Sequence, residues 1–216
     1  MKILALDAAL DGFSAALADG KRLHVAPGGA QDALERGLGR IERLLHEAGL
    51  TLRELDRIAV GLGPGSFTGV RIAVAYAKSL AYGSGVPLVG VSSYDALEPE
   101  DAGLPVLTVV RGRRGVICAR LREAAGTRTA CGPVGAVLDQ LLGGPPGALD
   151  AAGNTEDVLP EIAERGWTVR ALPPRAAVPA VAIVQLARTR APSPSPHALA
   201  PDYGEAPAVT QPKTRP

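Results

Sequence analysis

Residues 59–72 have the sequence AVGLGPGSFTGVRI, and this stretch decides the fold of the chain. It begins as the end of a strand, passes through Gly61, Gly63 and Gly65, and continues as a helix. Because glycine adopts backbone angles that other residues avoid, the three glycines predict a tight strand-to-helix turn. The first amides of such a helix are able to bind an anion.

Neither of the two common phosphate-binding motifs is present in this glycine-rich turn. No Lys-Ser/Thr pair follows the glycines, and Ser66 replaces the third glycine of the dinucleotide motif. Two alternatives therefore remain open, an anion-binding turn and a purely structural turn. The candidate residues of the glycine-rich turn are Gly61, Gly63, Pro64, Gly65, Ser66, Gly69 and Arg71.

The segments around the turn follow an α/β pattern. The expected strands are residues 2–7, 13–18, 21–25, 57–62 and 87–91, and the expected helices are residues 31–48 and 68–82. Asp-Gly pairs separate the first three strands, which predicts that these strands are antiparallel. Gly37 and Gly39 in the first helix indicate that another element packs close to its backbone. The order of elements is typical of an α/β fold.

A polar stretch at residues 98–101 predicts a boundary between two lobes. We expect an N-terminal lobe at residues 1–100 and a smaller C-terminal lobe at residues 101–190, with strands at residues 104–110, 115–122 and 148–152 and a helix at residues 134–142. From Ala191 onward seven of 26 residues are proline, so residues 191–216 are expected to form an extended or disordered tail.

Composition excludes several classes of function. The chain has 216 residues with 23 basic and 22 acidic side chains, and a net charge of +1 gives no reason to expect direct contact with nucleic acid or membrane. Cys118 and Cys131 lie 13 residues apart without a metal-binding pattern, so we expect two reduced thiols. The first residues lack the features of a signal peptide, and no apolar run is long enough to span a bilayer. These features predict a soluble cytoplasmic protein.

Four segments resemble the TsaB family, which is also called YeaZ. The segments are residues 3–7 (ILALD), 63–71 (GPGSFTGVR), 77–81 (AKSLA) and 87–93 (PLVGVSS). The resemblance implies the fold of the actin-like ATPase (ASKHA) superfamily, in which each of two lobes contains a mixed sheet and helices. It also implies a role in making threonylcarbamoyladenosine next to the tRNA anticodon. In that role the family member is a non-catalytic partner of the related enzyme TsaD and works with the ATPase TsaE.

The resemblance implies that this chain is not itself an enzyme. TsaD holds its metal with a His pair spaced HxxxH, and the corresponding positions here are Ser93 and Leu97. Neither side chain replaces an imidazole as a ligand. The three histidines of the chain, at positions 24, 46 and 197, are too scattered to form another pair. No metal site is therefore expected.

Asp7 ends the first expected strand, where the superfamily places an acidic residue near metal and phosphates. Ala8 and Ala9 follow it instead of the usual hydroxyl or glycine residues. Two alternatives remain for Asp7, a nucleotide contact or a carboxylate that backbone amides satisfy. We expect no cofactor of the chain's own, with ATP or ADP at the interface with TsaD as an open alternative. The alternative function is a weak ATPase, or a peptidase that uses Ser66, although no nucleophile-elbow motif surrounds this serine.

The second expected helix is apolar on nearly all sides, because Arg71 and Lys78 are its only charged residues. One apolar stripe faces the sheet of its own lobe, and the other needs the second lobe or another molecule. We interpret both helices as a partner-binding surface for TsaD or for a second copy of the chain; the alternative is that both are core. The candidate interface residues are Leu34, Leu38, Ile41, Val70, Ala73, Val74, Ala77 and Lys78. The arginines at 111, 113 and 114 are expected to be solvated, so tRNA is a partner only indirectly.

Overall fold

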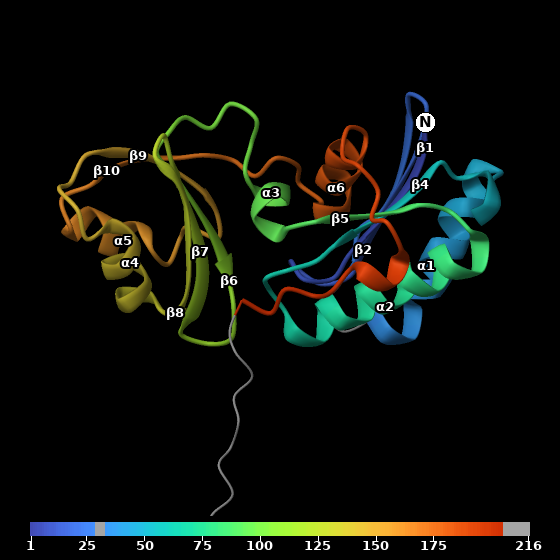
Figure 1. Cartoon of the computed structure of the whole chain (residues 1–216), viewed down its shortest axis with the longest axis horizontal. Coiled ribbons are helices and arrows are strands. Elements are labelled where there is room, and N and C mark those ends of the chain that lie inside the picture. The colour runs from blue at the N-terminus through green and yellow to red at the C-terminus, as the bar shows by residue number, and fades with distance from the viewer. Residues whose placement is uncertain (29–32, 205–216) are drawn as a thin grey trace, which may run out of the picture.

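The computed structural model describes residues 1–28 and 33–204, with the backbone alone for residues 33–35. They form two lobes that lie side by side (Figure 1). The N-terminal sheet has the order β3-β2-β1-β4-β5. Its strands are β1 Lys2–Asp7, β2 Ser14–Asp19, β3 Arg22–Ala26, β4 Arg57–Gly61 and β5 Leu88–Val91. The predicted antiparallel arrangement of the first three strands is confirmed, and β1, β4 and β5 pair in parallel.

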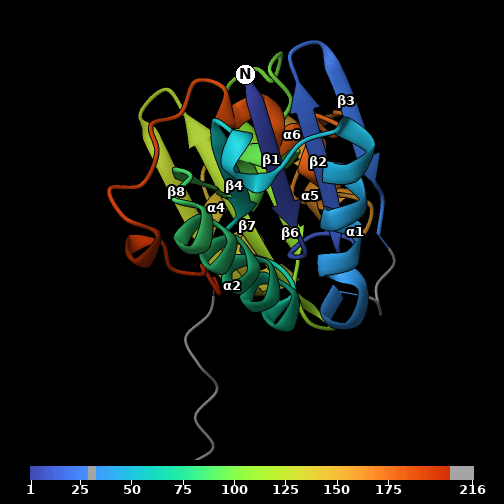
Figure 2. The ribbon, with the colours of Figure 1, turned by 90° about the vertical axis from the view of Figure 1, so that its right-hand side faces the viewer.

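Helices cover both faces of the N-terminal sheet. The helices are α1 Ala33–Ala48, α2 Phe67–Ser84 and α6 Pro179–Ala187, and a 3-10 turn, η1 Leu52–Glu54, precedes β4. Figure 2 shows α1 and α2 side by side on one face, with α6 behind the sheet. The predicted close approach to α1 is confirmed for Gly37, where an added Cβ would lie 2.8 Å from the ring of Tyr76. At Gly39 the same atom would meet nothing within 4 Å among the described residues.

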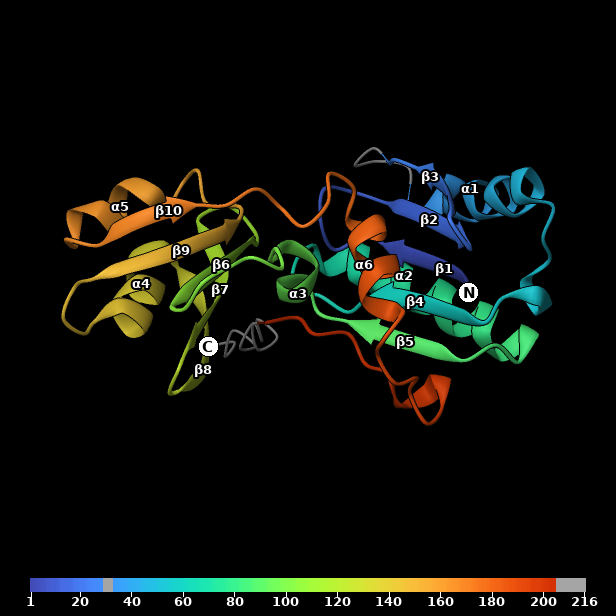
Figure 3. The same cartoon turned by 90° about the horizontal axis from the view of Figure 1, so that it is seen from above.

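The C-terminal lobe is a second mixed sheet with the order β10-β9-β6-β7-β8. Its strands are β6 Val106–Arg111, β7 Val116–Glu123, β8 Gly126–Pro133, β9 Ala148–Gly153 and β10 Thr168–Ala171. Its helices are α4 Val134–Leu142 and α5 Leu159–Glu164, and the short helix α3 Ser93–Leu97 lies between the lobes (Figure 3). The α/β class predicted from the sequence is confirmed. Of the helices in the described part of the chain, none combines the length and apolar character needed to cross a bilayer.

The last helix belongs to the N-terminal lobe, so the predicted assignment of residues 101–190 to the second lobe is wrong for α6. Ile183 is fully buried and Val184 is almost fully buried in the N-terminal core. The amide of Ala180 donates a hydrogen bond to Ser14 Oγ at 3.3 Å. The physical reason is that β1 is buried on both faces, so its sheet needs a helical layer on each side.

The proline-rich end is also part of the fold as far as it is described. The amide of Ser193 donates to the carbonyl of Leu88 on β5 at 2.8 Å, and the amide of Asp202 donates to the carbonyl of Leu62 at 2.6 Å. The 3-10 turn η2 Pro196–Ala198 lies between these anchors. The prediction of an extended or disordered tail is therefore wrong for residues 191–204. Residues 205–216 lie outside the described part of the chain.

The two cysteines form a disulfide, so the prediction of two reduced thiols is wrong. Cys118 on β7 lies directly opposite Cys131 on β8, with the Cα atoms 4.1 Å apart. The predicted elements did not include β8. Because β8 was not predicted, no predicted strand pair placed the two cysteines opposite each other.

Candidate functional site

The glycine-rich turn connects β4 to α2 and packs against the segment that follows β1. Gly65 has a φ of +151°, and an added Cβ there would collide with the carbonyl oxygen of Ala9. At Gly69 the added atom would collide with the carbonyl oxygen of Ala8. A side chain at either position would therefore push the turn away from the end of β1.

Hydrogen bonds within the chain use several amides of this turn. The amide of Ser66 donates to the carbonyl of Ala9 at 2.9 Å, and Ser66 Oγ accepts the amide of Gly69 at 3.2 Å as the N-cap of α2. The amide of Val70 donates to the carbonyl of Ser66 at 2.9 Å. These contacts favour the structural interpretation of the turn over anion binding.

Asp7 lies at the end of β1 and is fully buried. Its Oδ1 accepts the amide of Leu10 at 2.9 Å, whereas its Oδ2 has no hydrogen-bond partner among the described residues. Burial raises the pKa of Asp7 to about 7, even though hydrogen bonds from the backbone of Leu10 and Ala9 favour the charged form. The interpretation of Asp7 as a carboxylate that backbone amides satisfy therefore holds for one oxygen only.

The surroundings of Asp7 do not fit a bound nucleotide. A Cβ at Gly61 would collide with Asp7 Oδ2 and would lie 3.3 Å from Ile183 on α6. The unpartnered oxygen thus lies against Gly61, and the amides of Ser66, Gly69 and Val70 in the neighbouring turn are used in hydrogen bonds within the chain. We assign no chemical step to ATP or ADP at this position.

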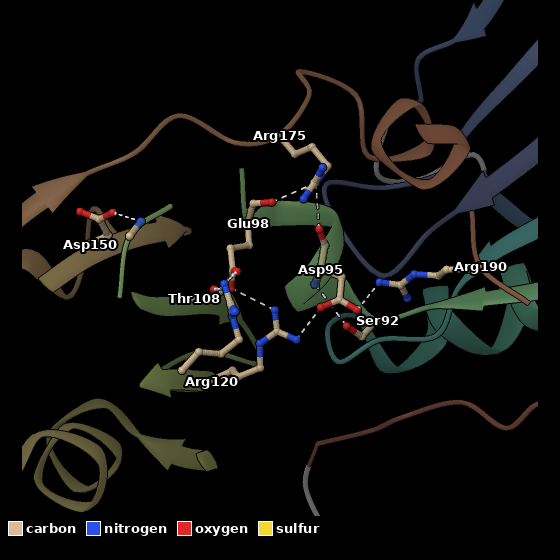
Figure 4. A network of polar contacts seen from close by, with 10 residues as sticks. Ser92, Asp95, Glu98, Thr108, Arg120, Asp150, Arg175 and Arg190 are labelled. Atoms are coloured by element: carbon tan, nitrogen blue, oxygen red, sulfur yellow. Dashed lines mark hydrogen bonds and ion pairs between the residues drawn. The ribbon is translucent and has the colours of Figure 1, made fainter. Parts of the chain in front are cut away.

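A network of ion pairs connects the two lobes through α3 (Figure 4). Arg120 on β7 donates to Asp95 Oδ1 at 2.5 Å and to Glu98 Oε2 at 3.0 Å. Arg190, which follows α6, donates to Asp95 Oδ2 at 2.6 Å. Thr108 on β6 donates its hydroxyl to Glu98 at 2.8 Å. Residues from both lobes therefore meet on the helix that joins them.

Electrostatics stabilises the charged forms of both carboxylates in this network. Burial opposes ionisation of Asp95, but hydrogen bonds from Arg190 and Arg120 outweigh it and lower its pKa. Burial likewise opposes ionisation of Glu98, and hydrogen bonds from Arg122, Thr108 and Arg120 lower its pKa. The two acidic groups are thus fully engaged as structural contacts between the lobes.

Ser93 and Leu97, which the resemblance aligns with the TsaD His pair, both lie buried on α3. The amide of Ser93 donates to the carbonyl of Gly63 at 2.7 Å, and Ser93 Oγ has no partner among the described residues. Within residues 1–28 and 33–204, no group of three or more potential metal ligands lies together. The chemistry of this position is a hydroxyl beside a hydrocarbon, which does not fit a bound metal ion.

The structure places most of the predicted interface residues in the core. Those that are at most 3% exposed are Ile41, Val70, Ala73, Val74 and Ala77. The prediction of a partner surface is therefore wrong for the four on α2, because their stripe packs against the N-terminal sheet. Lys78 Nζ donates to the carbonyl of Leu199 at 2.8 Å, whereas Leu38 is 51% exposed. The prediction for Leu34 falls on a side chain outside the described ones.

An apolar groove of about 530 Å³ lies between α1, η1 and α2. We call it the α1–α2 groove, and its lining residues are Leu38, Ile41, Glu42, Leu45, His46, Leu50, Leu52 and Leu80. Ile41 forms the buried floor, and Leu45, Leu50, Leu52 and Leu80 are half-buried. Sequence reasoning did not include Leu50 and Leu52, because they follow α1 and lie outside its helical period.

Two mixed five-stranded sheets with helices, joined through a short helix, define an actin-like α/β protein of the ASKHA type. The protein-family model described as "TsaD: tRNA N6-adenosine threonylcarbamoyltransferase" matches residues 17–173, and the chain belongs to this family. The chain is similar to the "tRNA threonylcarbamoyladenosine biosynthesis protein TsaB" of Haemophilus influenzae, at 36% identity over 98 residues, and of Escherichia coli, at 38% over 97 residues.

These matches cover 45% and 43% of the chain and 42% and 41% of the two relatives, so the chain spans less than half the length of the curated relatives it matches. A solved structure, "YeaZ from Pseudomonas aeruginosa", aligns with a TM-score of 0.69 and 26% identity. That alignment covers 94% of this chain and 99% of the other. The predicted resemblance to the TsaB (YeaZ) family and the predicted actin-like fold are confirmed.

Proposed function

We propose that this chain acts in tRNA threonylcarbamoyladenosine biosynthesis as a non-catalytic subunit. It binds TsaD and activates transfer of the threonylcarbamoyl group to the adenosine next to the tRNA anticodon. The α1–α2 groove is the observation that carries this proposal. TsaD fits as the occupant because it belongs to the same family, and related lobes can pair through equivalent faces in a nearly symmetric arrangement.

The chemistry of the groove suits a helical partner. Its walls are half-buried leucines, while Glu42 and His46 at its edge are exposed. An amphipathic helix buries its apolar residues in such a groove and leaves polar residues at the rim. The surface buried in the groove alone is too small for a stable complex. The proposed interface therefore includes neighbouring surface and buries about 1,600 Å² in total.

Two features support the non-catalytic role. Ser93 and Leu97 replace the His pair that the resemblance assigns to TsaD, and both side chains are buried. Asp7 faces α6 and Gly61. Catalysis is therefore assigned to TsaD, and this chain contributes a binding surface.

The proposed assembly has further members. TsaE joins the pair as its ATPase, and ATP or ADP binds at the interface with TsaD and not within this chain. A second copy of the chain competes with TsaD for the same groove. Contact with tRNA is made through TsaD, consistent with the balanced net charge of +1.

Leu38→Glu is expected to weaken binding of TsaD from the same organism by at least about 30-fold, or roughly 2 kcal/mol. Leu38 is 51% exposed on α1, so the substitution adds a charge to the groove without disturbing the core. Isothermal titration calorimetry gives the affinity, and light scattering gives the mass of the complex. Leu104→Glu is the matched control, because Leu104 is 53% exposed on the other lobe and should leave binding unchanged.

If Leu38→Glu and Leu104→Glu bind TsaD with equal affinity, the TsaD-binding surface lies outside the α1–α2 groove. Ala77→Glu is not a suitable probe, because Ala77 is fully buried and its substitution should unfold the lobe. The alternative function requires a separate assay, in which the chain alone is incubated with ATP and a divalent cation, or with peptide substrates. Turnover by the purified chain that Asp7→Asn or Ser66→Ala abolishes would replace the subunit role with an ATPase or a peptidase.

A further inference from the structure

Residues 191–204 form a C-terminal strap that crosses from the N-terminal lobe to the C-terminal lobe. Besides its backbone contacts with Leu88 and Leu62, the strap accepts a hydrogen bond from Lys78 Nζ on α2 at the carbonyl of Leu199. Its last described residue, Gly204, lies in the left-handed region with a φ of +70°. There the amide of Gly204 donates to Asp202 Oδ1 at 2.9 Å.

The end of the strap lies directly on the disulfide. A Cβ added to Gly204 would lie 2.5 Å from Cys118 Sγ and 2.7 Å from Cys131 Sγ. It would also lie 3.1 Å from Pro64 in the glycine-rich turn. Gly204 therefore fills a narrow space between the turn of one lobe and the sulfurs of the other, and no larger residue fits there.

We propose that the Cys118–Cys131 disulfide is a redox latch that holds the end of the strap. A thiolate of a dithiol reductant attacks Sγ of Cys131, the more exposed of the two residues, and the S–S bond breaks with Cys118 as the leaving thiolate. The second thiol of the reductant then displaces Cys131 from the mixed disulfide. The protein gains two electrons and two protons, and the reductant leaves as its own disulfide.

Reduction changes the space available to Gly204. Two sulfurs that are no longer bonded move apart to an ordinary non-bonded separation of roughly 3.5 Å or more. Cys118 is only 4% exposed and packs in the N-terminal core, so it has little room to retreat. The added volume is accommodated where Gly204 lies, and the last residues of the strap lift.

The lifted strap changes the surface at the beginning of α2. The ring of Tyr203 packs against Phe67 in a tilted arrangement, with the ring centroids 4.9 Å apart, and Arg71 lies over the same Phe67 ring. When residues 202–204 lift, Tyr203 leaves and more of Phe67 is exposed. The oxidation state of the disulfide thereby alters an apolar surface on α2, whichever partner α2 binds.

Amide hydrogen exchange of the full chain with and without dithiothreitol tests the latch. On reduction, exchange of the Asp202 amide should accelerate at least about tenfold, because this amide donates to Leu62 only while the strap is seated. The Ser193 amide, bonded to Leu88 further up the strap, should not change. Mass spectrometry of alkylated protein reports the state of both cysteines in the same samples.

Substitutions separate crowding from simple loss of the cross-link. The double variant Cys118→Ala and Cys131→Ala has neither the disulfide nor the thiols. Its strap should therefore stay in place, and exchange of the Asp202 amide should not change when the reductant is added. Gly204→Ala should accelerate exchange at Asp202 without any reductant, because its methyl group meets both sulfurs. Gly115→Ala is the matched control for backbone strain, since Gly115 has a φ of +76° and none of the described residues would lie within 4 Å of an added Cβ.

Two results would overturn the latch. The first is complete reduction of both cysteines with unchanged exchange at Asp202. The second is alkylation of both cysteines in the native protein before any reductant is added.

Discussion

Asp7→Asn is expected to raise the free energy of unfolding by about 4 kcal/mol at pH 8 and to leave it nearly unchanged at pH 4. Burial raises the pKa of Asp7 from its ordinary value of 3.8 to about 7. The folded chain therefore keeps the proton up to about pH 7, whereas the unfolded chain releases it near pH 4. Between these values the wild type loses stability as the pH rises, and a neutral amide of the same shape removes that loss.

Urea unfolding of both proteins at half-unit steps from pH 4 to pH 8 measures this difference. Asp11→Asn is the comparison, because Asp11 is exposed and asparagine tolerates its left-handed backbone. The charge of Asp11 is the smallest of the causes that shift the pKa of Asp7. The effect of Asp11→Asn should stay below about 0.5 kcal/mol at every pH. A difference for Asp7→Asn that does not change with pH would show that the effect comes from packing and not from a buried charge.

Glu98→Gln is expected to lower the free energy of unfolding by about 3 kcal/mol at pH 7. Glu98 is 6% exposed and accepts hydrogen bonds from Thr108, Arg120 and Arg122. The amide keeps the shape but removes the charge, so Arg120, whose side chain is 13% exposed, loses a charged partner inside the protein. Because the pKa of Glu98 is lowered from its ordinary value of 4.5, its contribution is fully present above that value and is lost as the pH falls through the lower folded pKa.

Glu156→Gln provides the comparison for this substitution. Glu156 also pairs with an arginine, Arg111, but the two side chains are 83% and 52% exposed. Exposed pairs contribute little, so the change should cost less than about 1 kcal/mol. Denaturant titrations of the two variants side by side measure this difference. Equal shifts of the two unfolding midpoints would contradict a stabilising role of the interlobe network.

The N-terminal lobe was predictable because its elements carry strong local signals. The strands around the glycine-rich turn are buried and apolar, and the turn needs glycine where Ala8 and Ala9 approach. The strands β8 and β10 were not predicted, because most of their residues are exposed or half-buried. Strands at the edge of a sheet have a neighbour on one side only, so their sequences lack a clear apolar alternation.

The candidate site was predictable only in part. The helix α2 has two apolar stripes, and its sequence does not show which one faces the sheet; the structure assigns Val70 and Ala77 to the core and Leu80 to the groove. The interlobe network joins residues as distant in sequence as Asp95 and Arg190. No periodic pattern marks such pairs, because only the tertiary fold brings them together.

The return of α6 to the first lobe has a consequence for biosynthesis. A ribosome delivers all five strands of the N-terminal sheet before residue 100, but the helix that covers one face of this sheet begins only at Pro179. Until that helix emerges, the apolar face of β1 has no cover from its own chain. The N-terminal lobe is therefore complete only after most of the chain has been synthesised. Chaperones that shield apolar surfaces are most needed during synthesis of the second half, while one face of this sheet is still uncovered.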